Sequence, residues 1–370
     1  MLFDLSKWKV CESRVSGKVM TSVNLQSIFD LNVFSDQPAL LVAEISANHD
    51  KDLSQALDLL QVAADSGWHC VKLQTYTADS LTMNSEHSSM KIDPIWGYAN
   101  LHELYSAAAM PMEFHEPLFA RARELGLVPF TSIYDPKDIA FLENMHCEIY
   151  KIASFELTFD DLLIEVASTN KPIILSTGMA DLREVEHAVN LIQKSGSSEL
   201  VILHCCSAYP APHESIHLNA MLAMREHFNL PIGFSDHTID SSAALAAVSM
   251  GAKVIEKHFT NDPTRDGPDH RFSATSEVLK EISDGVRTIG KLMGDSVKQT
   301  TPEECENKIR GRRSAFATRD LRPGTVISAG DFRFIRPGVG IPANQKHRLL
   351  GQKLDRQVLA GHPITPSDLS

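Results

Sequence analysis

The chain has 370 residues, a length that suggests two domains. Its hydrophobic content of 43% can fill a sizeable core. Its formal net charge of −12, from 35 basic and 47 acidic residues, argues against a general nucleic-acid or membrane-surface binder. An anionic substrate would therefore need a local cluster of positive groups.

The six cysteines match no zinc-binding pattern, and two of them, Cys205 and Cys206, are adjacent within a predicted strand. A reduced, cytoplasmic protein is the simplest interpretation. The first residues lack a long apolar segment and a small-residue cleavage site, so we expect no signal peptide. No apolar run approaches the roughly 18 residues that a membrane span needs, so we expect no membrane association.

Residues 1–37 are predicted to be an N-terminal extension, and a regular pattern begins at Pro38. Apolar runs predict strands near 39–45, 69–75, 127–132, 148–153, 171–176, 200–206, 230–235 and 252–259. Amphipathic segments predict helices near 53–66, 114–126, 136–145, 159–168, 182–195, 217–228, 240–251 and 275–294. This alternation predicts a (β/α)8 TIM barrel over residues 38–295. An open doubly wound sheet is the alternative, but no Gly-x-Gly-x-x-Gly follows any strand.

The composition changes after residue 295. Residues 296–313 are rich in charge and predict a linker. Residues 314–370 contain short strand-like pieces and two Pro-Gly turns, which follow Arg322 and Arg336. A turn-rich domain of this size is marginal alone, so we expect it to dock on another surface.

Two histidines, His237 and His258, each end a predicted strand, and a predicted helix separates them. Parallel neighbouring strands would bring both imidazoles to the same end of the sheet, where they suit a divalent metal. Two carboxylates lie nearby in the sequence, Glu256 and Asp269. The alternative is a pair of structural core histidines.

Two lysines, Lys72 and Lys151, are embedded in apolar strands, where an unpaired ammonium is costly. Each therefore needs an anion. One possibility is a bound phosphate or carboxylate, assisted by the hydroxyl groups at other strand ends, namely those of Ser132, Ser154, Ser176 and Ser235. The alternatives are an internal ion pair with Glu44 or Glu156, and a Schiff-base lysine of the kind that barrel aldolases use.

The strand-end motifs together resemble the sialic acid synthase family, whose members condense phosphoenolpyruvate with an N-acylated amino sugar to a nine-carbon 2-keto acid. The resemblance covers residues 38–370 and rests on segments 44–49, 71–74, 150–156, 175–179, 204–210, 235–238, 256–260 and 267–270. The last domain resembles the family's antifreeze-protein-like (SAF) domain. Segments 96–115 and 151–156 are more similar to pseudaminic acid synthases, whereas 267–270 is closer to the N-acetylneuraminate branch. Ser46 and Lys51 stand where the family usually has glycine.

The resemblance implies a transferase that is a cytoplasmic, domain-swapped homodimer. It implies Mn²⁺ or Mg²⁺ on His237 and His258. It implies a phosphoenolpyruvate site of Lys72, Ser132, Lys151, Ser154, Ser176 and Ser235. Sugar contacts or proton transfer would come from Glu44, Gln74, Glu156, Tyr209 and Asp269, and Arg336 would reach the sugar from the partner subunit. We therefore expect catalytic roles for Glu44, Glu156, His237, His258 and Asp269. A Schiff-base pyruvate aldolase and a non-enzymatic carbohydrate-binding protein are the alternatives.

Overall fold

The computed structural model describes residues 38–92, 97–197, 199–294 and 296–370. The predicted N-terminal extension lies outside these residues. The described chain divides into two compact units on either side of residue 295, and each is considered by itself. Within the described residues, no helix is both long and apolar enough to cross a membrane.

The first unit is a closed barrel of eight parallel strands in sequential order, which confirms the predicted barrel and excludes the open sheet. The strands are β1 (Leu40–Glu44), β2 (Cys70–Thr75), β3 (Val128–Ile133), β4 (Tyr150–Ile152), β5 (Ile173–Ser176), β6 (Leu200–Cys205), β7 (Ile232–Asp236) and β8 (Val254–His258). The barrel closes where β1 pairs with β8, with Glu44 opposite His258. Nearly every strand residue is buried, as expected for strands covered on both faces.

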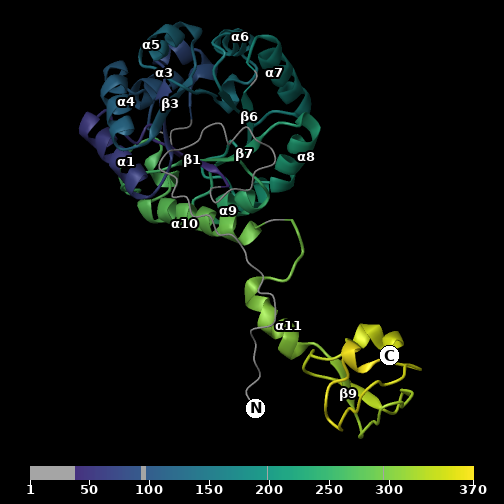
Figure 1. Cartoon of the computed structure of the whole chain (residues 1–370). Helices are drawn as coiled ribbons and strands as arrows, with labels where there is room; N and C mark the ends of the chain where they lie inside the picture. Colours follow the sequence, from purple (N-terminus) through teal and green to yellow (C-terminus); the bar gives the residue numbers. More distant parts are fainter. Residues whose placement is uncertain (1–37, 93–96, 198, 295) are drawn as a thin grey trace. The chain divides into compact units, whose positions relative to one another are not determined.

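Helices surround the strands, as Figure 1 shows. They are α1 (Leu53–Asp65), α2 (Ala78–Leu81), α3 (Leu101–Ala108), α4 (His115–Glu124), α5 (Ile139–Asn144), α6 (Asp160–Ser168), α7 (Leu182–Lys194), α8 (Leu218–Phe228), α9 (Ser242–Ser249) and α10 (Ser276–Met293). Their starts follow local rules. Asp181, for example, caps α7 by accepting from the backbone of Glu184, while the Glu184 side chain accepts from Asp181 N. The helices pack their apolar faces onto the strands in one continuous core.

Two features of this unit differ from the sequence expectation. The connection between β2 and β3 contains α2 and α3, which the hydrophobic pattern did not predict. The predicted helix at 240–251 is shorter, because Asp240 accepts from Ser242 N just before α9 begins.

The second unit begins with a helix that lies within the predicted linker. Residues predicted as a charged linker form a short turn (Pro302–Glu304) and α11 (Cys305–Gly311). Their charges are spaced for a helix, since Glu306 pairs with Arg310 one turn later. The antiparallel strands β9 (Ser314–Ala317) and β10 (Phe332–Ile335) follow. A small apolar core of this unit includes Leu321, Phe332, Ile341, Leu354 and Ile364.

Candidate active site

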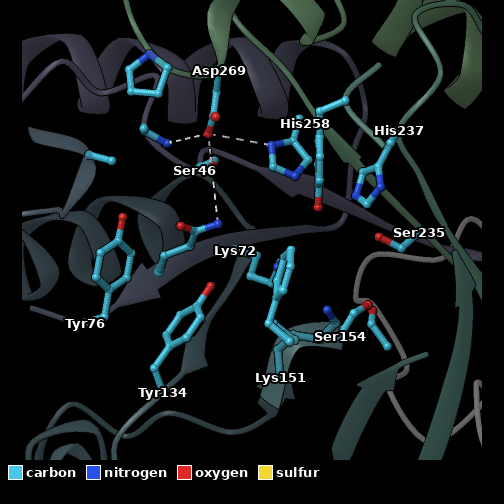
Figure 2. Close-up of a pocket in the computed structure, with 18 of the residues that line it drawn as sticks. Ser46, Lys72, Tyr76, Tyr134, Lys151, Ser154, Ser235, His237, His258 and Asp269 are labelled. Atoms are coloured by element: carbon cyan, nitrogen blue, oxygen red, sulfur yellow. Dashed lines mark hydrogen bonds and ion pairs between the residues drawn. The ribbon is translucent and has the colours of Figure 1, made fainter. Parts of the chain in front are cut away.

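A pocket of about 400 Å³ opens at the carboxyl ends of the barrel strands. This is the end at which parallel barrels place their chemistry. Most of the sequence-predicted site residues line it, namely Lys72, Gln74, Lys151, Ser154, Glu156, Ser176, Tyr209, Ser235, His237, His258 and Asp269. The backbone therefore gathers these side chains from six of the eight strand ends into one cavity, part of which Figure 2 shows.

Three predicted residues lie elsewhere. Glu44 and Ser132 are fully buried beneath the pocket, where both contact the ammonium of Lys72. Arg336 belongs to the second unit, where it is exposed.

A buried cluster of lysines and carboxylates forms one side of the site. Lys72 Nζ lies 2.6 Å from Glu44 Oε2 and 3.4 Å from Glu256 Oε2, and it donates to Ser132 Oγ at 2.9 Å. Lys151 Nζ lies 3.3 Å from Glu256 Oε1, which also accepts from Ser235 Oγ at 3.0 Å. Both lysines thus have carboxylate partners inside the protein, as the alternative of an internal ion pair predicted. The bond to Glu44 was foreseen, whereas the pairing with Glu256 was not.

Burial and charge act differently on the two carboxyls of this cluster. Burial raises the pKa of Glu44 to about 7, although the charge of Lys72 opposes the shift. Burial would also raise the pKa of Glu256, but Lys151 and Lys72 outweigh it and lower this pKa to about 2. Glu256 is therefore the permanent negative charge between the two lysines. For Lys151 the balance reverses, because burial outweighs the attraction of Glu256 and lowers its pKa.

Beside the lysines lies a group of small polar side chains. Ser154 Oγ accepts from Gly178 N at 2.9 Å and lies 3.1 Å from Cys205 Sγ. A Cβ at residue 178 would come within 2.1 Å of Ser207 Oγ, so only glycine leaves this space open. The buried hydroxyl groups of Ser176 and Ser207 have no hydrogen-bond partner among the described residues. Two ammonium groups with spare hydroxyl groups form a cradle suited to a phosphate or a carboxylate.

The two histidines face each other at the ends of β7 and β8, with ring centroids 5.4 Å apart. Burial lowers the pKa of His237 to about 4 and that of His258 well below its usual range, so both rings are neutral. His237 Nδ1 lies 2.7 Å from the carbonyl oxygen of Cys206, which fixes the proton there and leaves Nε2 with a lone pair. His258 Nδ1 is buried without a hydrogen-bond partner among the described residues, 4.0 Å from Asp269 Oδ2.

A neutral imidazole pair with free lone pairs is a donor set that can bind a divalent metal. The described residues contain no group of three or more His, Cys, Asp or Glu side chains arranged around one point. The protein would therefore supply two ligands, and substrate or water oxygens would supply the others.

Asp269 and three tyrosines border the rest of the pocket. Asp269 Oδ2 accepts from Ser46 Oγ and, at 3.1 Å, from Ala47 N. The ring of Tyr76 packs edge-on against those of Tyr134 and Tyr105, with centroids 5.2 and 6.1 Å apart. Tyr76 and Tyr134 lie across the pocket from the histidines (Figure 2). Tyr76 and Tyr134 directly follow β2 and β3, so the strand-end rule could have found them. Tyr105 lies on the unpredicted α3 and had no such signal.

Glu156 stands apart from the ion-pair cluster. Its Oε2 is buried and has no hydrogen-bond partner within the described residues. Burial raises the pKa of this carboxyl to about 7, in spite of the charge of Lys151. A carboxyl group with such a pKa can both donate and accept a proton near neutral pH.

Comparison with known proteins identifies the family. Residues 59–298 match the model of the NeuB family, and residues 312–370 match that of the SAF domain. The chain belongs to the NeuB family. This confirms the resemblance to sialic acid synthases and their C-terminal domain. The NeuB match spans β2 to β8 and therefore contains both lysines and both histidines of the pocket.

Individual NeuB-family relatives support the assignment along nearly the whole chain. The chain is 35% identical over 334 residues to the pseudaminic acid synthase of Helicobacter pylori, covering 90% of this chain and 98% of the relative. It is 34% identical to the N,N'-diacetyllegionaminic acid synthase of Campylobacter jejuni, covering 85% and 95%. The crystal structure of the N-acetylneuraminic acid synthetase of Leptospira borgpetersenii, in complex with citrate, is 29% identical with a TM-score of 0.66, covering 74% and 90%.

Proposed function

We propose that this protein is a nonulosonic acid synthase, a transferase that condenses phosphoenolpyruvate with the open-chain form of an acetamido sugar. The observation that carries the proposal is one pocket that combines a cationic, hydroxyl-lined cradle with a neutral histidine pair. The relatives named above make acids of this class. The first two are about equally similar to the chain, at 35% and 34% identity, so the proposal covers acetamido sugars as a class.

The reaction joins C3 of phosphoenolpyruvate to the aldehyde carbon of the sugar. Carbon C2 then carries positive character, water adds to it, and the tetrahedral intermediate expels phosphate. Lys72 and Lys151 hold the phosphate and carboxylate groups, with the hydroxyls of Ser154, Ser176 and Ser235. Ser132 orients Lys72 from below. Glu156 is the carboxyl group best placed to move a proton, because its pKa is about 7 and, unlike Glu44, it lines the pocket.

The metal would be Mn²⁺ or Mg²⁺ held by His237 and His258. When bound, it supplies Lewis-acid polarisation of the aldehyde oxygen. Asp269, beside His258, contacts the sugar, and Tyr209 packs its ring 4.3 Å from that of His237 and limits the rotation of this ligand. Gln74 contributes a further polar contact to the sugar.

The decisive experiment measures phosphate release from phosphoenolpyruvate with a panel of sugars that carry one or two acetamido groups. Release that depends on both substrates, with a nine-carbon acid as product, is the expected result. If none of the sugars stimulates release, the proposal is wrong.

A Schiff-base pyruvate aldolase is the second candidate, because burial lowers the pKa of Lys151 as such enzymes require. Borohydride with pyruvate should leave the mass of the protein unchanged if the synthase proposal is right. An adduct on Lys151 would favour the aldolase.

The proposal includes a site shared between two chains of a domain-swapped homodimer. Arg336 would reach the sugar in the barrel of the partner, where a guanidinium suits a ligand with many acceptors. The test mixes two inactive variants, Arg336→Ala and His237→Ala, under conditions that allow subunit exchange. A mixed dimer would hold one intact site, so activity should recover toward half the wild-type level per exchanged dimer. If activity does not recover although mass spectrometry confirms subunit exchange, Arg336 acts within its own chain or has no role in the reaction.

A further inference from the structure

Ser46 has a backbone conformation that is unfavourable for its residue type. Its φ is 49°, in the left-handed region that glycine adopts at no cost. Serine pays roughly 1 kcal/mol or more for it. Non-glycine residues with such dihedral angles are enriched at functional sites, where a side chain in a fixed place compensates the strain.

The hydroxyl of Ser46 lies between two polar groups of the pocket. It donates to Asp269 Oδ2, and it accepts from Gln74 Nε2 at 3.1 Å. The backbone of the same residue is also held, because Ser46 N donates to Glu44 Oε1 at 3.0 Å. Ser46 is 5% exposed and lines the pocket, so its hydroxyl belongs to the ligand-facing surface. Figure 2 shows Ser46 directly below Asp269.

These bonds decide which atoms of the two neighbours remain for a ligand. Asp269 Oδ2 already receives Ser46 Oγ and Ala47 N, so Oδ1 remains. Gln74 Nε2 is tied to Ser46, so its Oε1 points away from that bond. Each of the two side chains thereby keeps one acceptor oxygen for a ligand. A ligand that presents adjacent O–H or N–H donors, such as a hydroxyl beside an acetamido group, is complementary to them.

We infer that Ser46 is a positioning residue that sets the sugar specificity of this pocket by orienting Asp269 and Gln74. Glycine at this position would relieve the backbone but leave Gln74 Nε2 free to bond Asp269 directly. That bond would consume one acceptor and turn the amide. The inference rests on the proposed function for its kinetic test, whereas the placement of the two side chains can be tested without any activity.

The kinetic test compares Ser46→Gly and Ser46→Ala with wild type. Both variants remove the hydroxyl, but only glycine removes the strain. We expect both to raise KM for the sugar about tenfold. This change corresponds to the lower limit of the free energy that one hydrogen bond to a charged group contributes. KM for phosphoenolpyruvate should stay within about twofold. The melting temperature of Ser46→Gly should lie about 2 °C above that of Ser46→Ala.

Lys51→Gly is the matched control. Lys51 has a similar φ of 55° in the same loop, is exposed, and is not among the residues that line the pocket. Its replacement should leave both KM values unchanged. A wild-type KM for the sugar in Ser46→Ala would overturn the inference. Equal changes in both KM values would also overturn it, because they would show a merely structural role.

Crystal structures of wild type and Ser46→Gly provide the readout that needs no activity. We expect the amide of Gln74 to turn toward Asp269 in the variant. Unmoved Gln74 and Asp269 side chains would refute the positioning role. If wild type releases no phosphate with any sugar while the amide turns, the proposed function fails and the positioning role stands.

Discussion

Glu256 offers the sharpest test of the charge balance in the pocket. It is 3% exposed and contacts Lys72, Lys151 and Ser235 at 3.4, 3.3 and 3.0 Å. Glu256→Gln keeps the shape but removes the negative charge between two ammonium groups. Removing one partner of a buried ion pair costs about 3–5 kcal/mol of folding free energy. Because the amide oxygen of glutamine can still accept a hydrogen bond, we expect a loss of about 3 kcal/mol for this variant. For a barrel of this size, that loss lowers the melting temperature by about 6–12 °C.

The same substitution should strengthen the response to an anion. With Glu256 neutral, a phosphate ion in the cradle would take over the role of counter-charge to Lys72 and Lys151. Inorganic phosphate should therefore raise the melting temperature of Glu256→Gln more than that of wild type, since a ligand that binds the folded state more tightly stabilises it more. Differential scanning calorimetry at several phosphate concentrations measures both effects.

The control for this experiment is Glu281→Gln on the exposed face of α10, which should change stability by less than about 0.5 kcal/mol. If the melting temperature of Glu256→Gln lies within about 2 °C of that of wild type, the ion-pair reasoning is wrong. Equal phosphate stabilisation of both proteins would show that the lysines do not form the anion site.

Three further predictions concern the same pocket. Lys72→Met and Lys151→Met should each raise KM for phosphoenolpyruvate about ten- to a hundredfold with less effect on the sugar, and steady-state kinetics with each substrate varied would detect it. Chelation should abolish activity and Mn²⁺ or Mg²⁺ restore it, while His237→Ala should lower turnover at least about a hundredfold; full activity of a metal-free sample would contradict this. Because the pKa of Glu44 is raised from 4.5 to about 7, its contribution to stability is present below pH 4.5 and is lost as pH rises through 7. Glu44→Gln should therefore remove a fall of up to about 1.4 kcal/mol per pH unit between pH 5 and 7, measured by denaturant unfolding; an unchanged slope would refute the shift.

The barrel and most of its pocket could be predicted because both depend on local pattern. Buried parallel strands are continuous apolar runs, and polar residues that end them, such as His237 and His258, necessarily meet at one end of the barrel. The connection between β2 and β3 was missed because α2 and α3 have only four and eight residues, too short for a clear helical period. The helix α11 was missed because its residues are almost all polar, which is equally typical of a linker.

The pairing of charges could not be predicted in the same way. Lys151 on β4 and Glu256 on β8 lie 105 residues apart, on strands that face each other across the barrel. They meet only because inward-pointing side chains of opposite strands converge on the axis. Sequence spacing assigned Glu256 to the face of His258, but it contained no information on which lysine lay opposite. The internal partner for Lys72 was nearer to prediction, because β1 and β2 are neighbours both in the chain and in the barrel.

The balance of charge around the pocket explains why two lysines would not suffice for the proposed reaction. They face four buried or half-buried carboxyl groups, those of Glu44, Glu156, Glu256 and Asp269. A substrate that carries both a phosphate and a carboxylate would bring at least two negative charges to a pocket in which Glu256 already offsets part of the charge of the lysines, so further cations would favour its binding. A divalent metal on the histidines is one source. The C-terminal unit is another, because residues 296–370 contain 13 Lys and Arg against 7 Asp and Glu, whereas the other 295 residues contain 22 against 40. The acidic charge of the first 295 residues and the basic charge of the unit that carries Arg336 therefore agree with the proposal that a second chain completes the site.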